Sequence, residues 1–241
     1  SFVRGRFEFE ASLHEFNGIG TVENPGSTRI LFDELGVSDK IDWIQLKDAY
    51  RLISLKEGYD FTMPFGCDAF AKANNALHPE GEKYIRHFFE LCQQIRDAMN
   101  YLGASKGRPD PKVMMEKYPD YMRCASYTVN EAFEALGYPQ IIVDNLNAYW
   151  CYLGADGNNL SFLHYANMIY SYISGGAAIP TLKSHELSLA FETRIHELGG
   201  DIWFNTEVTK ILTDENGHVC GVRLADGSEV ETRHVVANCS P

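Results

Sequence analysis

The stretch GGAAIPTLKSHELSLAFETRIHELGGDIWFNTEVTKI, Gly175 to Ile211, decides the fold class. One glycine pair opens it, and a second pair stands at Gly199-Gly200. Between the two pairs, apolar residues recur at helical spacing: Leu182, Leu187, Leu189, Ala190, Ile195 and Leu198. The stretch therefore predicts a turn, a helix that ends at the second glycine pair, another turn and a strand.

Residues 201–239 predict four strands of a β-meander. Asn216-Gly217 and Asp226-Gly227 are dipeptides that favour tight hairpin turns. The last segment, HVVANC at 234–239, is a nearly continuous apolar run. Such a run is typical of a strand that is buried on both faces.

The N-terminal part predicts strands on either side of one short helix. GRFEFEAS, at 5–12, alternates apolar and charged residues, which predicts a half-buried strand. TRILFDELGV, at 28–37, predicts a helix that Ser27 or Thr28 caps and that Gly36 ends. The β-rich segments at 41–55 and 59–65 predict further strands, and we expect these strands to meet the C-terminal sheet in space.

The region from 68 to about 172 predicts mostly helices. Its longest apolar stripe, at helical spacing, runs through Ile85, Phe88, Phe89, Cys92, Ile95, Met99 and Leu102. Further on, aromatic residues are concentrated, among them Tyr149, Trp150, Tyr152, Phe162, Tyr165, Tyr170 and Tyr172. Two interpretations stay open: a helical core, or the lining of an apolar substrate cavity to which all of these except Tyr172 are assigned. The predicted class is α+β or α/β, a mixed sheet with a helical insertion.

Composition excludes several kinds of protein. The 241 residues carry a net charge of -12, which argues against nucleic acid or an anionic membrane as the main partner. The chain has no apolar run of eighteen residues, so we expect no membrane-spanning helix. It begins inside a predicted strand, without the apolar segment of a signal peptide, so we expect a piece of a longer, cytoplasmic protein. The six cysteines lack C-x-x-C spacing and Leu189 breaks an H-E-x-x-H motif at His185, so we expect free thiols and no metal.

The order of these elements resembles the flavin-dependent amine oxidase and phytoene desaturase superfamily, most closely the branch that holds the phytoene desaturases and carotenoid isomerases. The resemblance is carried at the C-terminus by the two glycine pairs, the helix leucines and Ile202, followed by Val208, Ile211, Val235, Val236, Asn238 and Pro241. At the N-terminus, RFEFEASLHEFNGIG resembles the strand and glycine loop that follow the nucleotide-binding motif of that superfamily. The matches cover about the first 36 and the last 70 residues.

The resemblance implies that three segments of the chain belong to different domains. Residues 1–36 would adjoin an FAD domain of Rossmann type, residues 37–174 would form the substrate domain, and residues 175–241 would return to the FAD domain. The resemblance implies that FAD is contacted by the backbone of Val208 and approached by His14, Glu15 and Asn238. The 241 residues contain no G-x-G-x-x-G fingerprint for the FAD pyrophosphate, so we expect a central piece that retains FAD poorly by itself.

Three functions remain open under this resemblance. The first is an FAD-dependent oxidoreductase that acts on a small apolar substrate, of isoprenoid type. Its electron acceptor is left open, and peripheral contact with a membrane is compatible with it. The second is a binding module without flavin, similar to the GDP-dissociation inhibitors that bind prenylated Rab proteins. The third is a flavin amine oxidase or an enzyme similar to protoporphyrinogen oxidase. The absence of a G-x-S-x-G elbow argues against acyl transfer.

Overall fold

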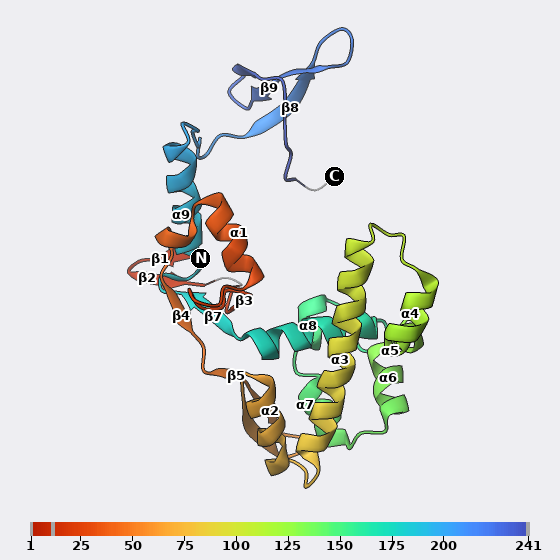
Figure 1. Cartoon of the computed structure of the whole chain (residues 1–241). Helices are drawn as coiled ribbons and strands as arrows, with labels where there is room; N and C mark the ends of the chain where they lie inside the picture. The colour runs from red at the N-terminus through yellow and green to blue at the C-terminus, as the bar shows by residue number, and fades with distance from the viewer. Residues whose placement is uncertain (1, 11–12, 240–241) are drawn as a thin grey trace. The chain divides into compact units, whose positions relative to one another are not determined.

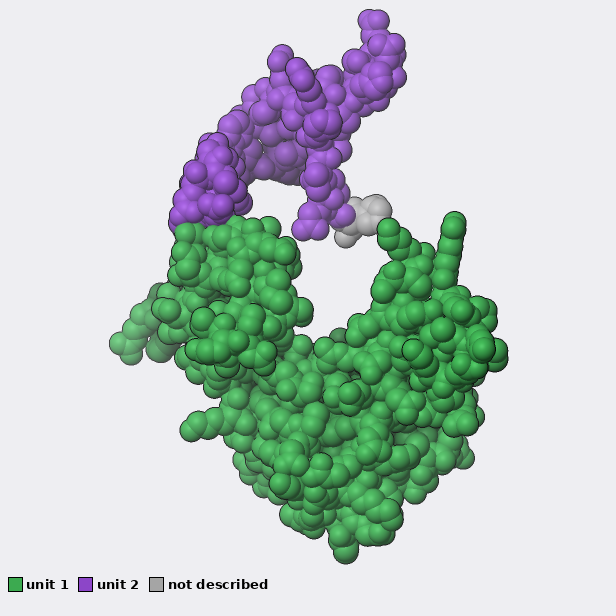
Figure 2. Space-filling model, viewed as in Figure 1, with its two compact units in different colours: residues 1–190 green, residues 191–241 purple. Residues whose placement is uncertain are grey.

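The computed structural model describes residues 2–10 and 13–239, and the chain divides into two compact units, 1–190 and 191–241 (Figure 2). The strands of the first unit are β1 (Phe2–Arg4), β2 (Phe7–Phe9), β3 (Phe16–Asn17), β4 (Trp43–Gln45), β5 (Asp48–Ser54), β6 (Tyr59–Pro64) and β7 (Ala177–Pro180). Its helices are α1 (Ser27–Leu35), α2 (Cys67–Ala73), α3 (Gly81–Ala104), α4 (Pro111–Lys117), α5 (Pro119–Cys124), α6 (Val129–Leu136), α7 (Gln140–Leu146) and α8 (Phe162–Gly175), with 3-10 turns η1 (Ser38–Lys40), η2 (Asn74–Ala76) and η3 (Trp150–Leu153). Helix α9 (Lys183–Glu197) crosses from the first unit into the second.

A small sheet joins the two ends of the first unit. Strand β7 lies between β3 and β4 and pairs antiparallel with both, with Phe16 opposite Ala178 and Ile44 opposite Ile179 (Figure 1). The segments that precede and follow the helical region therefore meet in space. The sequence predicted this meeting for the C-terminal meander, which pairs only within itself in the described residues, and it predicted a turn for the β7 segment. The combination of helices with small antiparallel sheets confirms the mixed α and β class.

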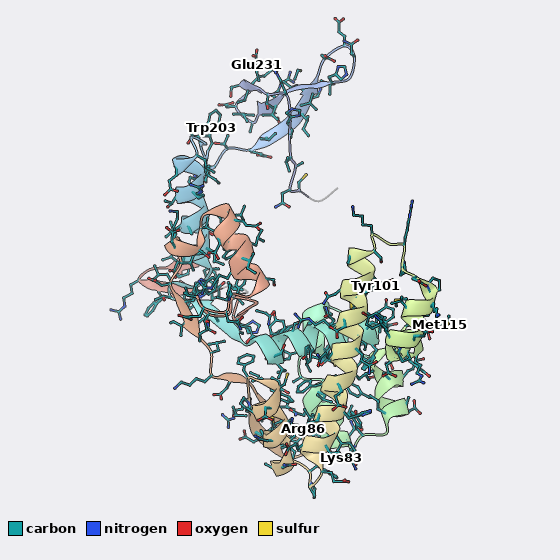
Figure 3. The ribbon with its side chains drawn as sticks, viewed as in Figure 1. Lys83, Arg86, Tyr101, Met115, Trp203 and Glu231 are labelled. Atoms are coloured by element: carbon teal, nitrogen blue, oxygen red, sulfur yellow. The ribbon has the colours of Figure 1, made fainter. Side chains whose placement is uncertain are left out.

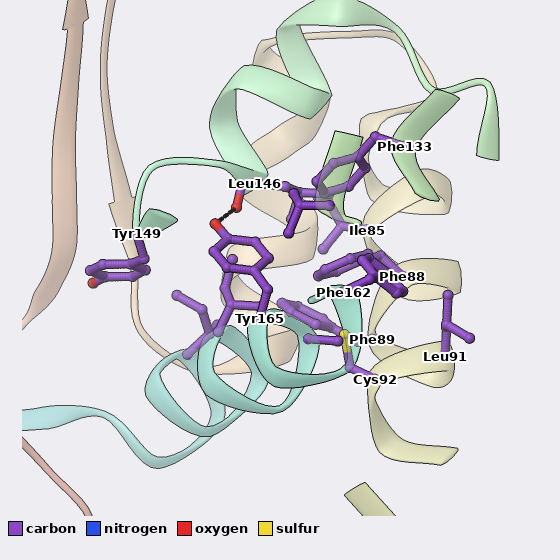
Figure 4. Packing of buried hydrophobic residues seen from close by; sticks show 14 of the residues in the cluster. Ile85, Phe88, Phe89, Leu91, Cys92, Phe133, Leu146, Tyr149, Phe162 and Tyr165 are labelled. Carbon is purple, nitrogen blue, oxygen red and sulfur yellow. Dashed lines mark hydrogen bonds between the residues drawn. The ribbon is translucent and has the colours of Figure 1, made fainter. Parts of the chain in front are cut away.

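The helical region packs around α3, whose apolar stripe is buried from Ile85 to Ile95, as its spacing predicted, and half-buried at Met99 and Leu102. Phe88 stacks on Phe133 with ring centroids 5.8 Å apart, and both rings meet the edge of Phe162 (Figure 4). Edge-to-face and offset contacts are the favoured geometries of aromatic pairs. The interpretation of this region as a helical core is thus confirmed for Phe162, and also for Tyr165, which donates a hydrogen bond to the Leu146 carbonyl inside the core.

Helix α1 ends at Gly36 as predicted, but the predicted N-cap is wrong. The capping residue is Gly26, and neither Ser27 nor Thr28 caps the helix through its side chain. Instead, the backbone oxygen of Gly18 accepts the N–H of Thr28 at 2.9 Å, while the Thr28 hydroxyl donates to Asn17 at 3.0 Å. A side chain at position 26 would lie 2.2 Å from the Gly18 oxygen, so the close approach of the two backbones requires glycine.

The second unit is a three-stranded meander rather than the four strands that the sequence predicts. Its strands are β8 (Val208–Thr213), β9 (Val219–Leu224) and β10 (Glu229–Glu231), in the order β10-β9-β8. Residues 234–239 form no strand, and Val236 is 97% exposed. An apolar run forms a doubly buried strand only where it joins a sheet that is covered on both faces. In the described part of the chain, β10 pairs with β9 alone, so no further strand lies beside it.

The half-buried strand predicted at the N-terminus is an exposed hairpin in the described residues. Strands β1 and β2 pair only with each other there, and Phe7 and Phe9 are both exposed. Ala11, the third apolar residue of the predicted strand, lies outside the described residues. Across the part of the chain that the structure covers, no helix has both the length and the apolarity needed to cross a bilayer.

Candidate functional site

Pairing of β3 with β7 brings the segment that contains His14 and Glu15 against the end of α8. Asn17 fixes this position because its amide donates to the backbone oxygens of Ser171, at 3.0 Å, and of Gly176, at 3.2 Å. Two polar residues that the sequence singled out are thereby placed beside aromatic residues more than 130 positions away.

His14, Tyr152 and Glu15 form a continuous hydrogen-bonded chain. The Tyr152 hydroxyl donates to Oε1 of Glu15 at 2.8 Å and lies 2.5 Å from Nε2 of His14. Because the single hydroxyl proton is directed at Glu15, the His14 nitrogen is the donor in the second contact. The His14 side chain is 65% exposed and the Glu15 side chain 5%, so the chain leads from solvent to a buried carboxyl.

Three tyrosines, Tyr149, Tyr152 and Tyr172, pack beside this chain and are called the tyrosine cluster below. Their ring centroids lie 4.9 Å apart for Tyr149 and Tyr152, and 5.3 Å apart for each pair with Tyr172. The Tyr149 hydroxyl donates to the Ala49 carbonyl at 2.8 Å. Tyr149 is buried and Tyr152 and Tyr172 are half-buried, so the last two rings are the accessible part of the cluster.

Burial controls the ionisation of these groups. Desolvation raises the pKa of Glu15 above its ordinary value, and the hydrogen bond from Tyr152 and the nearby His14 oppose this in part. Desolvation, followed by the neighbouring Glu15 carboxylate, raises the pKa of Tyr152 far above neutrality. The Tyr152 hydroxyl therefore keeps its proton at neutral pH and remains a donor.

The structure separates the six aromatic residues that were predicted to line a cavity. Tyr149, Phe162 and Tyr165 are buried in one hydrophobic core, and Tyr152 of the tyrosine cluster is half-buried against that core. Tyr170 is half-buried against Phe89, with ring centroids 5.9 Å apart. Trp150 is 48% exposed and faces a different, open pocket of about 520 Å³, which Tyr59 and Asp144 also line.

Tyr172 is the member of the site that the sequence prediction left out. It carries no motif, and it is one of several aromatic residues in α8. Its spacing of seven from Tyr165, which is core, gives no sign that it points to Tyr152. The signal that could have found it is position, because Tyr172 lies in the last turn of α8, just before the strand that pairs with β3.

Val208 and Asn238, the predicted FAD contacts near the C-terminus, lie in the second unit. Val208 begins β8 opposite Leu224 and borders an apolar pocket of about 370 Å³ together with Trp203, which lies between α9 and β8 (Figure 3). Asn238 is exposed in the segment after β10. Their roles, like those of His14 and Glu15 toward a flavin, stay predictions.

The described residues do not fit the pyrophosphate of a dinucleotide. That group is held where a parallel strand leads through a glycine-rich loop into a helix, and every strand pairing within residues 2–10 and 13–239 is antiparallel. The same residues hold no group of three or more His, Cys, Asp or Glu side chains that could share a metal ion. What the site offers is an aromatic wall, a buried carboxyl and a link to solvent.

These features define a mixed α and β protein with an aromatic and acidic site, and comparisons with known proteins specify the class further. Residues 126–241 match the model of the flavin containing amine oxidoreductase family. This match includes the tyrosine cluster and the meander but not His14 or Glu15. A comparison with curated proteins found no match.

One solved structure supports the fold assignment. The crystal structure of Rab GDI from Plasmodium falciparum is similar to this chain with a TM-score of 0.53 and 12% sequence identity, over 86% of this chain and 46% of that chain. At this identity the likeness shows the fold alone. The chain covers less than half of the length of that structure.

Proposed function

We propose that this chain is part of a flavin-dependent oxidoreductase that acts on an apolar substrate. The observation that carries the proposal is the family match over residues 126–241, which contain the whole tyrosine cluster. A flavin, when bound, supplies the acceptor for hydride or electrons from the substrate. Because the described residues do not form a pyrophosphate site, FAD binding is proposed for the natural protein as a whole and not for this chain alone.

The role of this chain in the proposal is to position the substrate and exclude water. The tyrosine cluster provides rigid aromatic surface, which favours contact with apolar groups. Glu15 provides an acidic group at the edge of that surface, where a proton can be held at Oε1 through the hydrogen bond with Tyr152. The proposal does not identify the electron acceptor. The proposed location of the natural protein is the cytoplasm.

The test is the visible absorbance spectrum of the purified natural protein, before and after incubation with FAD, beside that of this chain. We expect a flavin spectrum for the natural protein and little or none for the chain. If neither retains FAD after reconstitution, the redox proposal fails. Stoichiometric FAD in the chain alone would contradict the assignment of the pyrophosphate site to other residues.

The second candidate is a binding module for an apolar or prenylated partner, without flavin. The observation that favours it is the likeness to Rab GDI over 86% of the chain. The spectrum decides between the two functions, because only the oxidoreductase needs FAD. A natural protein that lacks FAD but binds a fluorescent geranylgeranylated peptide would support this second function.

A further inference from the structure

Glu15 and Glu186 have the same exposure but very different surroundings. Each residue is 8% exposed. Oε1 of Glu186 accepts the N–H of Asp42 and Oε2 accepts the N–H of Leu182, each at 2.7 Å, so both oxygens of this carboxylate have partners. The Glu186 carboxylate therefore has a structural role: it connects the start of α9 to the loop before β4.

Glu15 is not satisfied in this way. Its Oε1 accepts the Tyr152 hydroxyl, and no other hydrogen bond to this carboxyl occurs within residues 2–10 and 13–239. A nearly buried carboxylate with one hydrogen bond is costly, and burial without compensation favours its protonated form. A group of this kind is suited to exchange a proton rather than to hold the fold together.

The residues around Glu15 leave one route for that proton. Tyr149 and Tyr172, from the turn before η3 and from α8, offer no alternative route. The Tyr149 hydroxyl donates to the Ala49 carbonyl, and neither hydroxyl is hydrogen-bonded to Glu15 in the described residues. Among the described residues, His14 is the basic side chain that acts on Glu15: its Nε2 lies 3.9 Å from Oε1, and most of the side chain is in solvent. Tyr152 lies between the two and contacts both.

We propose that Tyr152 relays protons between the solvent-exposed imidazole of His14 and the buried carboxyl of Glu15. In the inward step, Nε2 of protonated His14 gives its proton to the Tyr152 oxygen, while the Tyr152 hydroxyl proton passes to Oε1 of Glu15. The N–H bond of the imidazolium and the old O–H bond break, and a new O–H bond forms on each oxygen. The products are neutral His14, neutral Tyr152 and a protonated Glu15, so charge and protons balance without a redox partner.

This relay goes beyond the proposed function because it needs no flavin. It would give the proposed oxidoreductase a means of exchanging protons between solvent and a buried carboxyl, but it operates in the chain alone. Its failure and the failure of flavin binding are therefore separate results.

The test is the rate at which Glu15 becomes protonated after a rapid drop in pH, followed by infrared absorption of the protonated carboxyl. A light-triggered proton donor starts the reaction, and the variant Glu15→Gln identifies the band by its loss. Tyr152→Phe keeps the ring and removes the relaying hydroxyl, and we expect the rate to fall by about tenfold or more. His14→Asn, at an exposed side chain, should slow the rate similarly.

The matched control is Tyr138→Phe, which removes a hydroxyl that lies 2.6 Å from Nδ1 of His87, outside the tyrosine cluster. We expect this variant to protonate Glu15 at the wild-type rate. Equal rates in wild type, Tyr152→Phe and His14→Asn would show that Glu15 exchanges directly with solvent and would overturn the relay. Circular dichroism checks that each variant is folded, and His14→Asn carries the test if Tyr152→Phe is not.

Discussion

Asn145 donates a hydrogen bond to Asn74 at 2.8 Å, although both side chains are fully buried and 71 residues separate them. The same Asn145 side chain accepts the hydroxyl of Tyr50 at 2.9 Å, and the Asn74 amide donates to the Phe70 carbonyl at 2.8 Å. These contacts connect α7, the β5 strand and the turn after α2. A buried polar network of this kind holds its members in one arrangement because every unpaired group inside the core is costly.

Replacing Asn145 with alanine should therefore destabilise the protein strongly. The change leaves the amide oxygen of Asn74 and the hydroxyl of Tyr50 with fewer partners in a dry environment, and we expect a loss of about 2–3 kcal/mol in the free energy of unfolding. Urea-induced unfolding measures it as a lower midpoint with an unchanged slope. Asn130→Ala is the matched control, because it removes an exposed amide pair, Asn130 with Asn158 at 2.9 Å, and should cost less than about 0.5 kcal/mol.

Phe162→Ala should cost about 3–5 kcal/mol in the free energy of unfolding, since it opens a cavity beside the stacked rings of Phe88 and Phe133 in the core. The expectation follows from the placement of Phe162 in the core rather than in a cavity wall. Thermal and urea unfolding measure the loss in unfolding free energy. Leu55→Ala is the control, because Leu55 is 96% exposed and its replacement should change the unfolding free energy by nearly zero. A cost below about 1 kcal/mol would mean that this ring is not packed as described.

The helices could be predicted well from the sequence because helix formation depends mainly on residues that are close together in the chain. The α3 stripe, the glycine that ends α1 and the hairpin turns of the meander all depend on residues within a few positions of one another. The failures have non-local causes. The N-terminus of α1 is satisfied by the distant Gly18 carbonyl, and the apolar run at 234–239 has no strand beside it in the described residues.

The candidate site was predictable only in part, for the same reason. His14 and Glu15 were singled out from a loop that resembles a family segment, and Tyr149 and Tyr152 from a local excess of aromatic residues. Nothing in the sequence joins the two sets, since the contact depends on β3 pairing with β7. The aromatic excess also could not distinguish Tyr152 from a core residue such as Phe162, because both fit a helical or turn segment equally well.

Glu186→Ala should loosen the start of α9. The variant removes the acceptor of two backbone N–H groups, those of Asp42 and Leu182, in a nearly buried setting. We expect a loss of about 2–4 kcal/mol in the free energy of unfolding. Hydrogen exchange of the two amides is the direct readout, and both should exchange faster than in wild type. Glu34→Ala, on the exposed face of α1, serves as the control and should leave both amides protected.

Glu15 should make the stability of the protein depend on pH in a direction opposite to that of most carboxylates. Its pKa in the folded state is raised above the ordinary value of 4.5, chiefly by desolvation. Between 4.5 and the raised pKa, the folded protein keeps a proton that the unfolded chain has released. Stability therefore falls as pH rises through this window and stays lower above it.

Glu15→Gln removes this dependence because the amide is neutral at every pH. The difference in unfolding free energy, variant minus wild type, should grow as pH rises above 4.5 and level off once Glu15 is ionised in the folded state. Urea unfolding of both proteins across this range measures the difference. Tyr152→Phe provides an internal check, since losing the hydrogen bond that lowers the pKa of Glu15 should extend the slope to higher pH. A difference that shrinks with rising pH would show that the folded state favours the ionised carboxylate, and would count against burial as the controlling cause.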